Sequence, residues 1–154
     1  MKIALFPGSF DPITIAHEDI LNRALPLFDK VVIGIGLNSA KQNFLEADVR
    51  EQILRSIYKD NPKIEIQTYY GLTVDFCKKI NANYMIRGIR SVADFEYERA
   101  IAQINQTMMP LVETIFILSK PEYSAISSTI VRDILRNGGD VSPFLSPIAF
   151  KYLK

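Results

Sequence analysis

The fold is decided by residues 3–17, which read IALFPGSFDPITIAH. The first part of this segment, residues 3–6, is apolar and predicts a strand that is buried on both faces. A Pro-Gly pair follows at once, and apolar residues then recur at helical spacing from His17 to Phe28. A buried strand, a turn and an amphipathic helix indicate the start of an α/β fold.

The rest of the chain repeats this alternation of short apolar runs and longer amphipathic segments. Because the apolar runs have no polar face, we expect a parallel sheet that is covered on both sides. The sequence therefore predicts one domain over residues 1–154, a doubly wound α/β fold with a five-stranded parallel sheet and helices on both faces. The expected strands are 3–6, 31–36, 64–69, 84–86 and 114–118; the expected helices are 17–28, 47–58, 74–80, 91–107, 128–136 and 147–153.

Composition and charge exclude several classes of function. Of the 154 residues, 48% are hydrophobic and 23% are charged, and the formal net charge of +1 predicts no bulk attraction to nucleic acid or to an anionic membrane. The single cysteine, Cys77, allows no internal disulfide and fits a small core residue of a helix. No apolar run is long enough for a signal peptide or a membrane span, so we expect a cytoplasmic protein.

Ligands of doubly wound sheets bind beyond the carboxyl ends of the strands, so the segments after the strands are the candidates for chemistry. After the first strand, Gly8 lets the backbone approach a ligand closely, and Ser9 offers a hydroxyl and an N–H. His17 lies near the start of the next helix, where free N–H groups favour an anion. A plain turn followed by a core histidine fits the same residues, and the Gly-Lys-Ser/Thr of a Walker A loop is missing.

Basic side chains follow two other strands. Lys41 comes after the second strand and can either neutralise a phosphate or remain solvated. Arg87 and Arg90 follow the fourth strand, and arginine forks match phosphate oxygens, although a solvated turn is the alternative. Ser91 and Asp94 are expected to form a capping box at the start of the next helix.

Hydroxyl groups follow the fifth strand, in residues 123–129, which read YSAISST. They can cap the next helix or hold a phosphate at its start, and capping alone is the simpler interpretation. Each of these segments has such a structural alternative. Their concentration after four strands of one sheet nevertheless favours a shared anion-binding site.

Residues 6–14 together with His17 resemble the T/HxGH signature of the nucleotidylyltransferase superfamily. Residues 86–98, IRGIRSVADFEYE, are similar more specifically to the bacterial phosphopantetheine adenylyltransferases, and the resemblance runs over nearly the whole chain. The family usually has Asn-Gly before the histidine, whereas this chain has Ile15-Ala16, so we expect a preserved site with altered ATP affinity. Tyr123 stands where many relatives carry Trp.

The resemblance implies an enzyme that transfers the adenylyl group of ATP to 4′-phosphopantetheine. The products would be 3′-dephospho-coenzyme A and pyrophosphate, in the penultimate step of coenzyme A biosynthesis. The resemblance also implies that Mg²⁺ accompanies the triphosphate, that the chain forms a homohexamer and that coenzyme A is a candidate feedback ligand. It implies no protein ligands for the metal.

The resemblance assigns roles to individual residues as well. His17 would stabilise the transition state, with Lys41 and Arg90 completing the catalytic group. The residues expected to contact phosphopantetheine are Ser9, Lys41, Thr73 and Arg87. The residues expected to contact ATP are Ser9, Phe10, His17, Gly88, Ile89, Arg90, Glu98, Tyr123, Ser124, Ala125, Ile126, Ser127, Ser128 and Thr129.

The reaction suits these residue types, because the attacking group is already an anionic phosphate and needs no activated side-chain nucleophile. In-line attack requires positioning and donors that stabilise charge at the α-phosphorus. Whether His17 donates as a neutral or a charged ring is left open by the sequence. Two other functions also stay open: a sister nucleotidylyltransferase acting on nicotinamide mononucleotide, or on glycerol phosphate with CTP, and a non-catalytic nucleotide-binding module.

Overall fold

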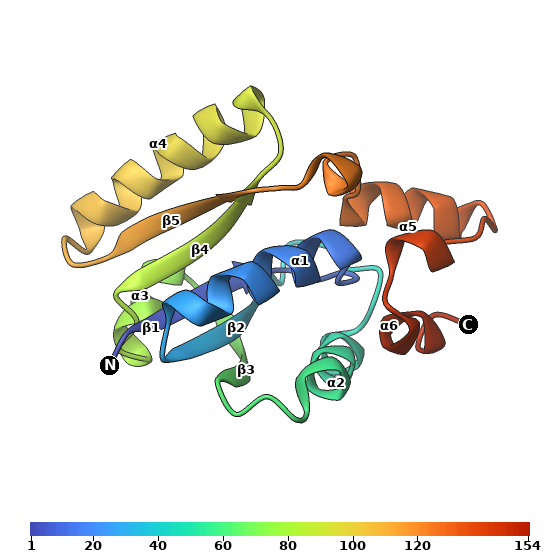
Figure 1. The fold of residues 1–154 in the computed structure, drawn as a ribbon, viewed down its shortest axis with the longest axis horizontal. Helices are drawn as coiled ribbons and strands as arrows, with labels where there is room; N and C mark the ends of the chain where they lie inside the picture. The colour runs from blue at the N-terminus through green and yellow to red at the C-terminus, as the bar shows by residue number, and fades with distance from the viewer.

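Five parallel strands form one sheet in the order β3-β2-β1-β4-β5, in a computed structural model that describes residues 1–154 (Figure 1). The doubly wound fold is therefore confirmed. The strands are β1 (Ile3–Gly8), β2 (Lys30–Leu37), β3 (Ile64–Tyr70), β4 (Tyr84–Ile89) and β5 (Glu113–Leu118). The α-helices are α1 (Ile15–Ala24), α2 (Ala47–Tyr58), α3 (Thr73–Lys79), α4 (Val92–Met108), α5 (Ser128–Arg136) and α6 (Pro147–Lys151).

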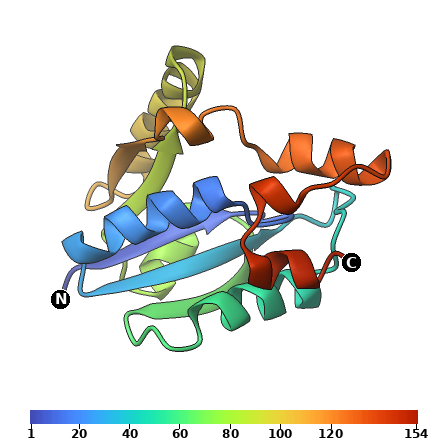
Figure 2. The same ribbon diagram turned by 45° about the vertical axis from the view of Figure 1, so that its right-hand side comes forward.

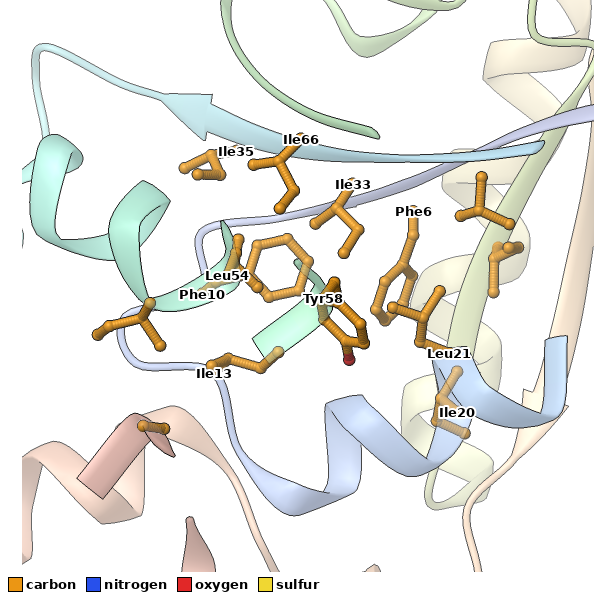
Figure 3. Packing of buried hydrophobic residues seen from close by; sticks show 14 of the residues in the cluster. Phe6, Phe10, Ile13, Ile20, Leu21, Ile33, Ile35, Leu54, Tyr58 and Ile66 are labelled. Carbon is orange, nitrogen blue, oxygen red and sulfur yellow. The ribbon is translucent and has the colours of Figure 1, made fainter. Parts of the chain in front are cut away.

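Both faces of the sheet are covered by helices. Because consecutive strand residues point to opposite sides, neighbouring residues of one strand belong to different buried clusters. Phe6 of β1 belongs to a large buried cluster with Ile33 of β2, Leu21 of α1 and Tyr58 of α2 (Figure 3). The neighbouring Leu5 belongs to a second cluster under α3. The C-terminal α6 lies beside α2 on the side of the large cluster (Figures 1 and 2). None of the helices combines the length and the apolar composition that crossing a membrane requires.

The strand order reverses between β1 and β4. The chain runs outward from β1 through β2 to β3, then crosses back to β4 beside β1 and continues to β5. β1 and β4 pair only at Ala4–Tyr84 and Leu5–Met85. Beyond these pairs the backbones of the two strands no longer pair with each other, which opens the crevice where doubly wound folds bind ligands.

Two strands extend by two or three residues at their carboxyl ends beyond the bounds that the sequence pattern predicts, whereas the other three differ by only one residue at an end. β1 ends at Gly8 and β4 at Ile89, so Arg87 lies within a strand and not in a turn after it. The Pro-Gly and Arg-Gly signals are outweighed by pairing of these residues with β2 and β5. Register with a neighbouring strand, and not local composition, sets both ends.

The predicted capping box at the start of α4 is half right. Ser91 caps the helix by accepting a hydrogen bond of 3.1 Å from the Asp94 N–H. The Asp94 carboxylate, however, accepts from the backbone N–H and the Nε of Arg90, at 3.0 and 3.1 Å. Asp94 therefore orients Arg90 at the end of β4 and does not complete the capping box.

Candidate active site

Three cavities meet at Ser9, at the carboxyl ends of the strands. The first cavity, of about 350 Å³, lies between β1, β4, α3 and α4, and the second, of about 290 Å³, lies between β1, β4 and the starts of α1 and α5. The third, of about 490 Å³, lies over the ends of β2 and β3. Because Ser9 borders all three, they form adjoining parts of one site.

Most of the residues that the sequence singles out line these cavities. The first is lined by Ser9, Thr73, Arg87 and Glu98. The second is lined by Ser9, His17, Arg87, Gly88, Arg90, Glu98, Ile126, Ser127 and Ser128. The third is lined by Ser9 and Lys41. The residues outside the walls of all three are Phe10, Ile89, Tyr123, Ser124, Ala125 and Thr129.

The end of β1 and the loop that follows it have carbonyl groups bonded to side chains from other elements. Arg87 donates to the Pro7 carbonyl at 2.9 Å, Arg50 to the Ser9 carbonyl at 2.8 Å and Arg132 to the Asp11 carbonyl at 2.9 Å. The N–H groups of Ser9, Phe10 and Asp11, in contrast, donate to no atom of the chain. Of these three residues only Ser9 borders the cavities, so its free N–H is the one available to an anion there.

His17 is held in one tautomer by the start of its own helix. The backbone N–H of Thr14 donates to Nδ1 of His17 at 3.0 Å, so Nδ1 carries the lone pair and Nε2 carries the proton of the neutral ring. The Phe10 ring packs against the imidazole with its centroid 5.4 Å away. Burial, followed by the charges of Arg87 and Arg90, lowers the pKa of His17 from 6.5 to about 4. His17 therefore presents a neutral Nε2–H donor at the second cavity.

Arg87 and Glu98 form an ion pair in the wall shared by the first and second cavities. Arg87 donates to both carboxylate oxygens of Glu98, at 2.9 and 2.6 Å, while its third nitrogen holds the Pro7 carbonyl. Glu98 is an orienting partner of this guanidinium and not an isolated surface carboxylate. The arrangement fixes the plane of Arg87 between the two cavities.

The hydroxyls before α5 make protein contacts as well as lining the second cavity. Ser127 accepts a hydrogen bond of 3.2 Å from the Ile130 N–H, so the capping interpretation holds for this residue. Ser128 donates to the Pro12 carbonyl at 2.7 Å. Since Ser127 only accepts in its cap, its own O–H remains able to donate to a ligand.

No group of three or more His, Cys, Asp and Glu side chains is placed to hold a metal ion. The two carboxylates at the second cavity are Glu98 and Asp94, and both are bonded to arginines. Any divalent cation here would need its oxygen ligands mainly from a bound phosphate group.

Two buried charged residues support the site: Asp11, which lies in the segment that the sequence singles out but has no assigned role there, and Arg50, which the sequence reading misses. Asp11 is 4% exposed and Arg50 is 1% exposed, and both bond to the backbone of loops that border the cavities. A signal for Arg50 was present, because it precedes Ile53 and Leu54 by three and four residues on the apolar face of α2.

The chain is similar to known proteins over most of its length. The profile of the cytidylyltransferase-like family matches residues 5–134. A phosphopantetheine adenylyltransferase of Flavobacterium johnsoniae is 49% identical over 140 residues, covering 91% of each chain. One of Bacteroides thetaiotaomicron is 45% identical over 145 residues, covering 94% of this chain and 95% of its own length.

The solved structures that match resemble the chain in fold. A Plasmodium falciparum nicotinic acid mononucleotide adenylyltransferase aligns with a TM-score of 0.72 at 21% identity, over 99% of this chain and 94% of its own. At this level of identity the likeness concerns the sheet and helices alone.

Proposed function

The chain belongs to the phosphopantetheine adenylyltransferases within the cytidylyltransferase-like family, and we propose how its cavities divide between two substrates. The reaction transfers the adenylyl group of ATP to 4′-phosphopantetheine and yields 3′-dephospho-coenzyme A and pyrophosphate. ATP occupies the second cavity and the pantetheine arm occupies the first. The observation that carries this division is the wall of Arg87 and Ser9, which both cavities share.

The first cavity suits the pantetheine arm because its walls are mixed apolar and polar. Leu72, Met85 and Ile101 provide apolar surface, and Thr73 and Asn105 provide polar groups. A long flexible chain with two amide groups needs both kinds of contact. At the end of this cavity, Arg87 and the neighbouring Lys41 of the third cavity would hold the phosphate of the acceptor.

The second cavity suits a triphosphate. Arg90, the O–H of Ser127 and the start of α5 provide donors to phosphate oxygens. His17 donates its Nε2–H to an α-phosphate oxygen, where negative charge grows as the phosphorus becomes five-coordinate. The acceptor phosphate attacks the α-phosphorus in line from the side of Arg87 and forms the new P–O bond. The bond from the α-phosphorus to the oxygen bridging to the β-phosphorus breaks, and pyrophosphate leaves with that oxygen toward Arg90.

Any Mg²⁺ at this site would be brought by ATP and held by its phosphate groups. The pairing of Glu98 with Arg87 and of Asp94 with Arg90 leaves no preformed carboxylate cage, which fits a metal carried by the nucleotide. When bound, the ion neutralises charge on the triphosphate.

The enzyme acts in the cytoplasm, and coenzyme A, which shares the pantetheine arm, can occupy the same cavities as a feedback ligand.

The chain assembles into a homohexamer through α4. Large apolar side chains lie exposed along this helix, among them Val92 (79%), Tyr97 (70%) and Ile104 (61%). Figure 1 shows α4 along the outer edge of the sheet beside β5. An exposed apolar surface of this extent on one helix is typical of a protein–protein contact.

The test is release of pyrophosphate from ATP and Mg²⁺ with phosphopantetheine, set beside CTP and beside nicotinamide mononucleotide and glycerol phosphate as acceptors. We expect turnover only with ATP and phosphopantetheine. Faster turnover with another acceptor would assign the chain to a sister nucleotidylyltransferase, which residues 86–98 argue against. ATP binding without turnover on any acceptor would make it a non-catalytic module.

A further inference from the structure

Asp11 and Arg50 are buried charges of opposite sign that form no ion pair, either with each other or with another side chain. Burying a charge without an ionic partner is costly unless its hydrogen-bonding groups are satisfied. Both residues bond instead to backbone groups, with only Nη2 of Arg50 left without a partner, and neither residue lines a cavity. Their role is therefore to be found in the segments that they hold.

The four hydrogen bonds of this pair join the two loops that carry Ser9 and Lys41. The Asp11 carboxylate accepts from the N–H groups of Phe44 and Leu45, at 2.8 and 2.7 Å. In the other direction, Arg50 donates to the Ser9 carbonyl at 2.8 Å and to the Leu45 carbonyl at 3.1 Å. We call this set of bonds the cross-brace.

The segment 38–43, which carries Lys41, has no hydrogen bond to the rest of the protein. Its only bonds are local, from the N–H groups of Ala40 and Lys41 to Asn38. The segment is fixed at one end by β2 and at the other by the cross-brace at Phe44 and Leu45. The cross-brace therefore sets how far Lys41 lies from Ser9.

We propose that Asp11 and Arg50 are positioning residues, which hold Lys41 beside Ser9 so that its ammonium group reaches the phosphate of the acceptor. This inference rests on the proposed function, in which that phosphate binds between Lys41 and Arg87. Weakening the cross-brace lets the segment 38–43 move away from the acceptor. The triphosphate in the second cavity is not contacted by this segment, so ATP is affected less.

The test compares D11N and R50K with the wild-type chain in steady-state assays that vary each substrate. We expect the KM for phosphopantetheine to rise on the order of tenfold, as for loss of one charge-assisted hydrogen bond. In D11N, whose lost bonds are to Phe44 and Leu45, the KM for ATP is expected to change about twofold or less. The control is R55K, because Arg55 lies on the same helix and also donates to a backbone carbonyl, that of Ile66, away from the cavities.

A double-mutant cycle separates positioning from general stability. In a K41A background, D11N is expected to add no further increase in the KM for phosphopantetheine, because the group that it positions is gone. Equal effects of D11N with and without Lys41, or an equal rise in both KM values, would overturn the proposal.

Hydrogen exchange of the backbone amides tests the cross-brace independently of catalysis. In D11N, the amides of Phe44 and Leu45 are expected to exchange about tenfold faster or more, with the core strands unchanged. Unchanged exchange at these two amides would overturn the cross-brace even in an active enzyme. Faster exchange in a chain that never uses phosphopantetheine would leave the cross-brace standing and refute the proposed function instead.

Discussion

The backbone N–H of Thr14 donates to Nδ1 of His17 across 3.0 Å, and this one bond decides which proton the ring can offer. A backbone N–H group can only donate, so the bond requires an unprotonated Nδ1. The imidazolium form would lose the bond and place two N–H groups against each other. The bond from Thr14, the burial of the ring and the two nearby arginines together keep His17 neutral, with Nε2–H as the donor.

His17 is the only histidine, so NMR can follow its titration without ambiguity. We expect a midpoint near the value of about 4 to which burial and the arginines lower the pKa, and ¹⁵N shifts typical of the Nε2–H tautomer. A midpoint at 6 or above, or an Nδ1–H tautomer, would contradict the assigned role.

The lowered pKa of His17 also predicts how the stability of the fold depends on pH. The folded pKa of about 4 lies below the unfolded value of 6.5, so the unfolded chain binds the proton more readily in between. The stability that His17 contributes is thus fully present above 6.5 and is lost as the pH falls toward 4. Melting temperatures of wild type and H17Q should converge over this range, and parallel curves would contradict it.

The H17A variant is expected to fold and bind ATP but to lose kcat by on the order of 10²–10³, because one transition-state donor is gone. H17Q keeps a side-chain N–H donor and is expected to retain more activity than H17A. Steady-state kinetics with thermal melts check both. Near-normal turnover of H17A would remove His17 from the mechanism.

Removing the ammonium group of Lys41 tests the division between the two substrates. K41A is expected to raise the KM for phosphopantetheine by about tenfold or more, with little change for ATP. K59A serves as the control, since Lys59 is exposed at the end of α2. A change confined to ATP would reverse the assignment of the cavities.

Ile15-Ala16, which replaces the family's usual Asn-Gly, predicts that affinity for ATP and stability of α1 change in opposite directions when Ala16 is replaced by glycine. Ala16 is 9% exposed and lines the second cavity, so its methyl group takes space beside the nucleotide. A16G is expected to lower the KM for ATP while destabilising α1 by about 1 kcal/mol, the cost of glycine in a helix. An unchanged KM with a lower melting temperature would show that the methyl group does not restrict ATP.

The exposed apolar side chains of α4 predict that this helix forms the contact between subunits of the hexamer. I104R is expected to break a hexamer into smaller species, because a charge would be buried in the contact. L27R is the control, since Leu27 is 56% exposed but lies outside α4. Sedimentation velocity distinguishes them, and an unchanged hexamer in I104R would move the interface elsewhere.

The sequence predicted the sheet, its helices and the groups that line its open edge, because each strand is a short continuous apolar run and each helix has apolar residues at helical spacing. It could not predict the partners of those groups, since Arg87 meets Glu98 and Arg50 meets Ser9 only after the chain has folded. The protonation of His17 was undecidable for the same reason, because it depends on burial and on charges brought by β4. Glu98 was expected as a contact of ATP, and its pairing with Arg87 adds an orienting role that no spacing reveals.

The wall between the first two cavities has a consequence for inhibition. Pro7, Gly8, Ser9, Arg87 and Glu98 border both cavities, so one compound that spans this wall would meet surfaces needed by both substrates. Linking two weak fragments across it would gain an effective concentration in the millimolar range for a short linker. A substitution that excludes such a compound would also impair binding of both substrates, which narrows the routes to resistance.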